Sequence, residues 1–265
     1  MRLLAVQTDP LWLDPVENRR RVEAAVDASG FTAGDYVVLP EMCETAWTSK
    51  AEHLQCLDGM KVPSVEWLAG LARARRVWLQ AGFGERLEDG RRANSVAVVG
   101  PDGALKAIYR KNFLFPSERD AFVAGESLTL VDTGAGVVCP LICYDLRFPE
   151  LWRLAALAGA ECFAVSSSWP AARHEHWRAL LVARAIENQA FVVASNRTGR
   201  DPSNEYLGGS AVISHLGARL EERGAEVGAA SAAFDREALV EWRAKFGALR
   251  DIRASLLGSM RIGRA

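Results

Sequence analysis

The sequence lacks the features that mark several classes of protein. Lys and Arg together number 32 and Asp and Glu 33, so the net charge is −1 and neither sign is in excess. Without a basic field to gather phosphates, the chain is not expected to bind nucleic acid or to coat a membrane surface. Gln7 and Asp9 interrupt the apolar N-terminal stretch, which is therefore too short for a signal peptide or a membrane span. These absences predict a cytoplasmic protein.

The sequence has few cysteines, and their number is odd. The five cysteines are Cys43, Cys56, Cys139, Cys143 and Cys162. They show no paired spacing, which favours a reducing compartment in which an important cysteine acts as a free thiol. His174 and His176 lie one residue apart at an expected helix start and point to different faces, with no second ligand cluster to join them. We therefore expect neither a metal nor a cofactor.

The composition and the order of apolar runs predict one α/β domain. The 265 residues are 49% hydrophobic and 25% charged, as in globular proteins with a real core. Strands and helices alternate through the middle of the chain, and turns at residues 101–103 and at Gly217 join strands that look antiparallel. We predict a layered α/β sandwich over residues 1–265, with a tail after about residue 250 that is extended or lies at an oligomer interface.

Helix ends are readable at several places. The Asp-Pro-Val-Glu segment of residues 14–17 resembles a capping box with proline at the first helical position, and Gly30 is expected to end this helix. Ser64 is expected to cap a helix that continues through Arg75. A long helix is predicted at about residues 174–188.

Cys143 has a setting that suits a nucleophile. The apolar residues 136–142 predict a buried strand, and a proline soon afterwards opens the next helix, so the cysteine lies in the connection. There the backbone amide of Tyr144 can face a developing oxyanion. Cys139 lies inside the strand and Cys162 begins another, so both are interpreted as structural. A buried core thiol is the usual fate of a free cysteine, so this setting alone leaves both interpretations of Cys143 open.

Two charged residues follow strand ends in the same way. Glu41 comes after the apolar run that ends at Pro40, and Lys111 comes after the strand that leads to Tyr109. Residues beyond the carboxyl ends of strands in an α/β sheet converge on one crevice, which would bring both to Cys143. A thiol needs a neighbouring base or cation to react as a thiolate. Taken singly, Glu41 is equally a helix cap and Lys111 a solvated surface charge.

Several segments together resemble the nitrilase, or carbon–nitrogen hydrolase, superfamily. Its three signature blocks are matched by LPEM at residues 39–42, YRKNFLFPSERDAFVAGE at 109–126 and PLICYDLRFPELWR at 140–153. The resemblance extends to HWRALLVARAIENQAFVVASNRTG at 176–199 and YLGGSAVIS at 206–214. Order, spacing and flanking residues agree, and the resemblance covers nearly the whole chain.

The resemblance implies a fold and a mechanism. The fold is a four-layer α-β-β-α sandwich with two mixed β-sheets, commonly assembled as a homodimer. Glu41, Lys111 and Cys143 occupy the positions of the Glu–Lys–Cys triad, and Glu118 that of a second, supporting glutamate. Glu41 would take the thiol proton, and Lys111 with the Tyr144 amide would hold the oxyanion. A thioester intermediate is then hydrolysed, without metal or cofactor.

The resemblance is strongest to the branch of small ω-amidases, which hydrolyse terminal amides of short dicarboxylate monoamides such as 2-oxoglutaramate. The chain has Phe113 where many amidase relatives carry a histidine, which leaves the pocket lining open. A distal carboxylate needs a bidentate cation, for which Arg147, Arg173 and Arg197 are candidates, although a structural ion pair is the more usual role of each, above all of Arg147 with Asp145 so near. Trp169 is expected in the core or the pocket lining.

Three other kinds of function are alternatives to an ω-amidase. A nitrilase proper or an N-carbamoyl amidase would use the same triad. A catalytically silent scaffold would keep the fold without a reactive thiol. A papain-like cysteine hydrolase would need a histidine base, for which the candidates are His53, His174, His176 and His215.

Overall fold

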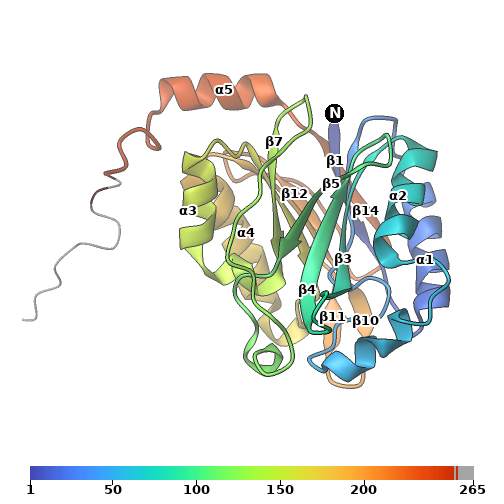
Figure 1. Ribbon diagram of the computed structural model, residues 1–265. Helices are drawn as coiled ribbons and strands as arrows, with labels where there is room; N and C mark the ends of the chain where they lie inside the picture. The colour runs from blue at the N-terminus through green and yellow to red at the C-terminus, as the bar shows by residue number, and fades with distance from the viewer. Residues whose placement is uncertain (254, 256–265) are drawn as a thin grey trace, which may run out of the picture.

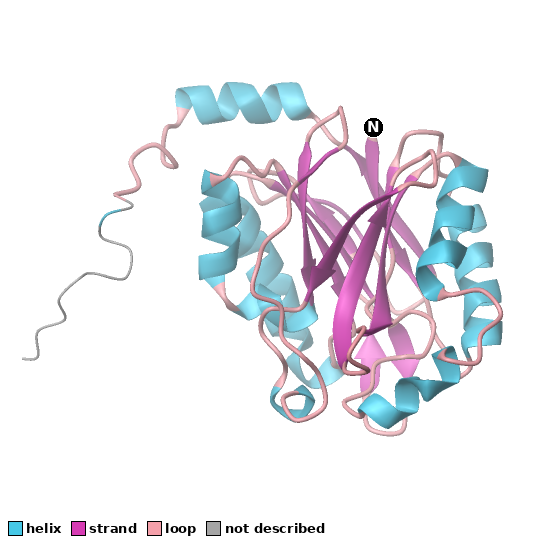
Figure 2. Ribbon diagram, viewed as in Figure 1, coloured by secondary structure: helices cyan, strands magenta, loops and turns pink. Residues whose placement is uncertain are grey.

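The computed structural model describes residues 1–253 and 255 of the chain. Two six-stranded sheets form its centre, and helices cover their outer faces (Figures 1 and 2). The tail after about residue 250, expected to be extended or to lie at an oligomer interface, is largely outside the described residues. None of the helices in the described part of the chain is both long and apolar enough to cross a membrane.

The first sheet has the strand order β14-β1-β2-β3-β4-β5. Parallel pairing joins β1 to β2 and β2 to β3, whereas the other neighbours are antiparallel, so the sheet is mixed. Its strands are β1 (Arg2–Gln7), β2 (Tyr36–Val38), β3 (Trp78–Arg86), β4 (Arg92–Val99), β5 (Leu105–Arg110) and β14 (Gly228–Ala233).

The second sheet has the order β13-β12-β9-β8-β7-β6, with a parallel centre of β7, β8 and β9. Its strands are β6 (Val131–Asp132), β7 (Val137–Ile142), β8 (Cys162–Ser167), β9 (Phe191–Asn196), β12 (Ala211–Ile213) and β13 (Arg219–Glu222). A separate two-stranded hairpin is formed by β10 (Thr198–Arg200) and β11 (Glu205–Leu207). The sequence reading did not anticipate this hairpin.

Helices α1 (Pro15–Ala28) and α2 (Ser64–Arg75) cover the first sheet, and α3 (Pro149–Leu157) and α4 (His174–Asn188) cover the second (Figure 1). Helix α5 (Arg236–Lys245) follows the last strand. Short 3₁₀ turns complete the elements: η1 (Ala51–Leu57), η2 (Pro116–Glu118), η3 (Cys143–Arg147) and η4 (Ala171–Arg173).

The side-chain alternation of β1 shows how the layers are made. Leu4 and Val6 pack with the helices α1 and α2, whereas Leu3 and Ala5 pack toward the second sheet. Successive side chains of a strand point to opposite faces, so one strand contributes to two cores. A third core lies between the second sheet and its helices, around Trp152. The predicted four-layer α-β-β-α sandwich with two mixed sheets is confirmed.

The local predictions are mostly confirmed. The Asp14 carboxylate accepts the backbone N–H of Glu17 at 3.1 Å, and Gly30 follows the helix with a φ of +70°. The prediction for Ser64 is wrong in detail, because Pro63 is the N-cap and makes no side-chain cap hydrogen bond. A pyrrolidine ring has no oxygen to offer, so burial of the apolar face of α2 stabilises this helix start instead.

Candidate active site

Glu41 lies in the loop that follows β2, where the chain passes very close to β3. A Cβ on Gly82 would lie 2.5 Å from the Glu41 Cα. Only glycine permits this approach. The Gly82 N–H donates to the Pro40 carbonyl at 3.1 Å, and Met42 has a φ of +46°. The loop is therefore bent sharply and held against β3, which fixes the Glu41 backbone.

Lys111 lies directly after β5 and is 1% exposed. Its Nζ is 2.9 Å from Oε1 of Glu41 and 2.8 Å from Oε2 of Glu118, and both carboxylates are fully buried. Glu118 ends the turn η2, whose preceding residue Phe115 donates its N–H to Glu118 Oε2 at 2.7 Å. The structure thus joins three of the residues expected from the sequence in one buried cluster.

Asn94 on β4 was not anticipated, although it connects the two carboxylates. Its Nδ2 donates to Oε1 of Glu41 at 2.7 Å and to Oε1 of Glu118 at 2.8 Å. The Trp47 indole also donates to Glu118, at 2.9 Å, and the Ser168 N–H donates to Oε2 of Glu41 at 2.9 Å. A polar side chain inside a fully buried strand was the signal that could have identified Asn94.

The charges of the cluster offset the cost of burial. Burial lowers the pKa of Lys111, but the charges of Glu118 and Glu41 outweigh it and hold that pKa well above its ordinary value. Burial likewise raises the pKa of Glu118, yet the Lys111 ammonium opposes this effect and the net pKa is lowered. One cation and two carboxylates leave a net negative charge. Forming a further anion beside this cluster therefore costs free energy.

Cys143 lies at the sharp turn between β7 and η3. Its φ is +40°, in the left-handed region that a non-glycine residue enters at a cost of about 1–3 kcal/mol. Burial raises the pKa of the thiol, and the charge of Glu41 adds to this, with only partial opposition from Lys111. The sulfur is therefore protonated at neutral pH, and a thiol in that state can act as a nucleophile only if a neighbouring group accepts its proton.

Asp145 holds this turn in place. Its Oδ2 accepts from the Tyr109 hydroxyl at 2.8 Å and the Ile142 N–H at 3.0 Å, and its Oδ1 accepts from the Phe113 N–H at 3.0 Å. Burial raises the pKa of Asp145 to about 6, against the lowering effect of these hydrogen bonds. The side chain ties the end of β7 to the segment that follows Lys111, so it positions two of the three expected catalytic residues.

A cavity of about 310 Å³ opens onto the sulfur and the ammonium. Aromatic side chains line it together with serines, two arginines and one asparagine. The lining residues are Trp47, Ser49, Lys111, Phe115, Ser117, Cys143, Tyr144, Arg147, Ser168, Trp169, Pro170, Arg173, Ser203 and Asn204. Tyr144 and Trp169, both expected near the pocket, are among them.

Two of the three candidate arginines reach this cavity. The Arg147 guanidinium lies 4.7 Å from the centre of the Trp169 ring, and that of Arg173 lies 5.6 Å from the centre of the Phe115 ring. Neither of them makes an ion pair with a carboxylate of the described residues. The cavity therefore has two cations and no acid of its own beside them, which is the charge pattern that favours an anionic ligand.

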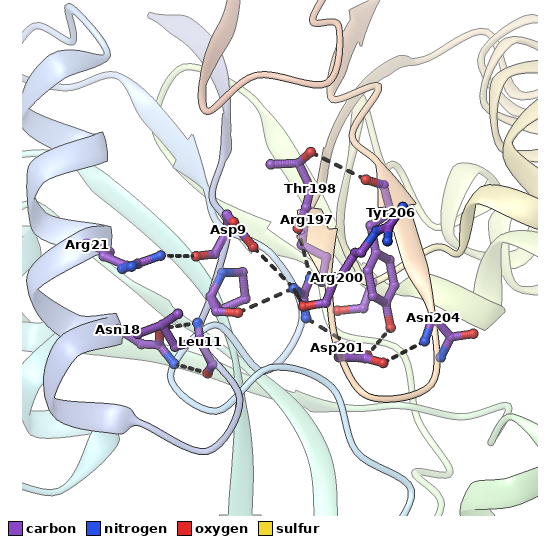
Figure 3. Close-up of polar contacts among 12 residues, drawn as sticks. Asp9, Leu11, Asn18, Arg21, Arg197, Thr198, Arg200, Asp201, Asn204 and Tyr206 are labelled. Atoms are coloured by element: carbon purple, nitrogen blue, oxygen red, sulfur yellow. Dashed lines mark hydrogen bonds and ion pairs between the residues drawn. The ribbon is translucent and has the colours of Figure 1, made fainter.

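Arg197 is not a lining residue, contrary to the expectation from the sequence. Its side chain is fully buried, and its Nη2 donates to the carbonyls of Arg200 at 3.0 Å and Pro10 at 3.3 Å (Figure 3). Asn196 and Arg197 are neighbours at the end of β9, so their side chains point to opposite sides. Asn196 accepts the Trp169 N–H at 2.7 Å, which leaves Arg197 on the side away from that residue.

Phe113 does not line the cavity. Its ring stacks on that of Phe148, with a distance of 3.7 Å between the ring centres and an angle of 11° between the ring planes. None of the four histidines is among the lining residues either, so a papain-like base receives no support. Among residues 1–253 and 255, no group of three His, Cys, Asp or Glu side chains could hold a metal ion.

Comparison with known proteins gives consistent matches over nearly the full length. The family model described as carbon-nitrogen hydrolase matches residues 2–244. The 2-oxoglutaramate amidase of Bacillus subtilis (strain 168) is 34% identical over 254 residues, covering 95% of this chain and 97% of the relative.

Two solved structures are similar throughout. XC1258 from Xanthomonas campestris, a CN-hydrolase superfamily protein with an arsenic adduct in its active site, has a TM-score of 0.87 and 31% identity and covers 99% of both chains. The E41Q mutant of an amidase from Nesterenkonia sp. AN1, which shows Michael addition of acrylamide at its active-site cysteine, has a TM-score of 0.82 and 26% identity, with coverage of 97% and 98%.

Proposed function

This chain belongs to the carbon–nitrogen hydrolase family, and we propose that it hydrolyses the terminal amide of a small carboxylate, with Cys143 as the nucleophile and with release of ammonia. Membership in this family and relatives that are amidases make the chain an amidohydrolase. The observation that carries the finer proposal is the shared cavity. Cys143 and Lys111 both line it, and the Lys111 ammonium lies 2.9 Å from the Glu41 carboxylate.

The first half of the reaction forms a thioester. Glu41 accepts the thiol proton as the sulfur attacks the amide carbon, so that a carbon–sulfur bond forms and the carbonyl oxygen becomes an anion. Lys111 and the backbone N–H of Tyr144 stabilise that oxyanion. The C–N bond then breaks, and Glu41 returns the proton to the leaving nitrogen, which departs as ammonia.

The second half releases the acid. Water attacks the thioester carbon and gives its proton to Glu41. The carbon–sulfur bond breaks, and the sulfur takes the proton back from Glu41 as the carboxylic acid forms. Glu118 does not exchange protons in this scheme. With Asn94 it keeps Lys111 protonated and oriented, which its short contacts to that ammonium support.

The substrate class follows from the unpaired arginines. Arg147 and Arg173 lie against aromatic rings that hold their guanidinium planes in place. A carboxylate at the far end of the substrate would give each cation the anionic partner that the described residues do not supply. We therefore propose a short monoamide such as 2-oxoglutaramate or glutaramate, a choice that the similarity to a 2-oxoglutaramate amidase also supports.

A substrate panel tests this proposal. Ammonia release is measured for 2-oxoglutaramate, glutaramate, N-carbamoyl amino acids and simple nitriles, with Cys143→Ala as the inactive control. We expect the carboxylated amides to give the highest kcat/KM. A protein active only on nitriles or only on carbamoyl compounds would have the same triad and a different substrate, and the proposal would then be wrong.

The proposed role of the cavity arginines in substrate binding can be tested with a matched control. Replacing Arg173 with Gln should raise KM for glutaramate about tenfold or more, because a charge-assisted hydrogen bond is lost. The same replacement at Arg86, which is exposed at the end of β3, should leave KM unchanged. Equal effects of the two variants would remove the argument for a carboxylate subsite.

A catalytically silent scaffold is the alternative from another class. Iodoacetamide distinguishes it, because a thiol with a working base reacts faster than a thiol without one. Cys56 is partly exposed like Cys143 and serves as the internal reference. Faster alkylation of Cys143 at neutral pH supports the enzyme, whereas equal alkylation supports the scaffold.

We also propose a homodimer. Support comes from exposed apolar side chains on the outer face of the second helix layer: Leu154 and Leu157 of α3 and Ile186 of α4 are between 43% and 55% exposed. Exposed apolar side chains of this kind favour association with a second protein surface. Gel filtration with light scattering decides it, and a monomer at micromolar concentration would contradict the proposal.

A further inference from the structure

The hairpin β10–β11, which belongs to neither central sheet, contributes to the cavity wall. Its strands pair from Thr198↔Leu207 to Arg200↔Glu205, and its tip carries Ser203 and Asn204, which both line the cavity. A two-stranded hairpin on its own is marginally stable in water. Its position must therefore be set by contacts with the rest of the protein.

Asp201 shapes the tip. Its Oδ1 accepts the backbone N–H groups of Ser203 at 2.7 Å and Asn204 at 2.8 Å, and its Oδ2 accepts the Tyr206 hydroxyl at 2.6 Å (Figure 3). One carboxylate thus fixes the turn and the following strand. The side chain is only 2% exposed, so these contacts are not exchanged with water.

Arg197 fastens the shaped tip to the body of the protein. Its Nη2 donates to the carbonyls of Arg200 in the hairpin and Pro10 in the loop after β1, and lies 3.4 Å from Oδ1 of Asp9. Its Nη1 lies 4.0 Å from Oδ2 of Asp201. The guanidinium therefore connects the loop after β1 with the start of the hairpin turn.

The Tyr206 ring completes this anchor. The Arg197 guanidinium carbon lies 4.3 Å from the ring centre, while the Tyr206 hydroxyl reaches Asp201. Arg197, Asp201 and Tyr206 thus form a closed set of contacts that includes one cation, one anion and one ring. Within the described chain none of the three lines the cavity, so none can touch a substrate there.

The hairpin also lies beside the proposed carboxylate subsite. Strand β11 packs against the turn η4, which carries Arg173. The Ser203 hydroxyl and the Asn204 amide at the tip are hydrogen-bond donors that suit a carboxylate. The placement of the tip therefore determines how far from Cys143 the distal end of a ligand can lie.

We propose that Arg197 and Asp201 are positioning residues that hold Ser203 and Asn204 at the carboxylate end of the cavity, and that they thereby set the chain length of the preferred monoamide. The inference rests on the proposed function for its substrate class. It assigns no role in proton transfer to either residue. It requires that loss of the anchor changes binding and length preference much more than the chemical step.

The test uses Asp201→Asn, which keeps the size of the side chain and removes its charge. The control is Glu205→Gln, which breaks the exposed ion pair with Arg200 across the same hairpin, 2.9 Å in length. KM and kcat are measured for the monoamides of succinic, glutaric and adipic acid. The affinity for the corresponding free dicarboxylates is measured by calorimetry, a readout that needs no turnover.

We expect Asp201→Asn to raise KM for the best monoamide, and Kd for its diacid, about tenfold, with kcat changed less than about threefold. The preference among the three lengths should become flatter, while Glu205→Gln behaves as wild type. Unchanged affinity and length preference in folded Asp201→Asn would overturn the inference, as would an equal loss of kcat on all substrates.

Asn204→Ala covers the case in which Asp201→Asn does not fold, because it changes only a side chain at the tip. A selective loss of affinity for the preferred diacid supports the inference, and unchanged affinity overturns it. If the wild type releases no ammonia from any amide, the proposed function fails. The calorimetric comparison then still decides whether the anchor controls the size of the anion that binds.

Discussion

Lys111 and Arg197 are both buried cations, and each lies near two carboxylates. The Lys111 ammonium contacts Glu41 and Glu118 at 2.9 Å and 2.8 Å, and both acids are 0% exposed. The Arg197 guanidinium lies 3.4 Å from Asp9 and 4.0 Å from Asp201, and the Asp9 side chain is 43% exposed. The ion pairs of Lys111 are therefore short and shielded from water, whereas those of Arg197 are long and one of their carboxylates is partly hydrated.

The neighbours of each cluster explain the difference. Backbone carbonyls take up most of the Arg197 donors, so that cation joins segments of chain. Lys111 has carboxylates as its partners and a thiol beside it at the cavity surface. A buried ion pair by itself indicates neither catalysis nor stability. What indicates chemistry here is a nucleophile and an open cavity next to the pair.

Replacing each cation with methionine should give the largest difference between the two sites. Lys111→Met removes the proposed oxyanion partner and should lower kcat by roughly 10²–10³-fold. Arg197→Met should reduce thermal stability while each folded molecule keeps kcat within about tenfold of wild type. Steady-state kinetics normalised to the folded fraction from circular dichroism give both values. An equal loss of kcat in the two variants would contradict the assignment of different roles.

Asp145 offers a contrast with Glu118, because it is a buried carboxylate that makes no ion pair with any cation of the described residues. Burial raises its pKa to about 6, whereas the pKa of Glu118 beside Lys111 is lowered. A raised pKa means that the stability Asp145 contributes is fully present below its unfolded pKa, near 4, and is lost as the pH rises through about 6.

The free energy of unfolding of the wild type should therefore fall relative to Asp145→Asn by about 2 kcal/mol between pH 4 and pH 7. Urea denaturation of both proteins across this range measures the difference. A constant difference, or one that grows in favour of the wild type with rising pH, would show that the carboxylate is not destabilised by its burial.

Glu118→Gln should have a smaller effect, on the order of tenfold in kcat. It removes a negative charge that raises the pKa of Lys111, so that pKa falls. Less negative charge in the cluster also favours the ionised form of neighbouring acids, so the acid limb of kcat/KM should move to lower pH. A pH profile of kcat/KM measures this shift, and movement to higher pH would contradict the charge argument.

Asn94→Ala should have the smallest effect, roughly a few-fold in kcat. The amide donates to both carboxylates, and loss of a donor to an ionised acid raises the pKa of that acid. The acid limb of the kcat/KM profile should therefore move to higher pH, opposite to the shift in Glu118→Gln. The two variants together test whether charge and hydrogen bonding act on the same proton transfer.

Much of this structure could be predicted from apolar runs and helix signals. The α2 and α4 ranges and the start of a strand at Cys162 agree with the predictions from the sequence. Glu41, Lys111 and Cys143 could be selected because each follows a strand, and Glu118 through the family resemblance. The pairing of β1 with β14 could not, because local patterns do not determine which distant strands become neighbours.

The misses have physical causes. Hairpin β10–β11 has strands of three residues with charged ends, too short to give an alternating pattern. Arg197 belongs to a segment that resembles the family, yet strand alternation directs its side chain away from the cavity. Asn94 is a polar residue in a fully buried strand, which marks it as hydrogen-bonded, but the sequence does not show that its partners are the two carboxylates.

Mass spectrometry of the intact protein, quenched in acid after brief exposure to glutaramate, shows whether Cys143 carries the acyl group during turnover. We expect a mass increase equal to the acyl group, located by peptide mapping at Cys143 and absent from Cys143→Ala. Ammonia release without such an adduct, or an adduct on a different cysteine, would contradict it.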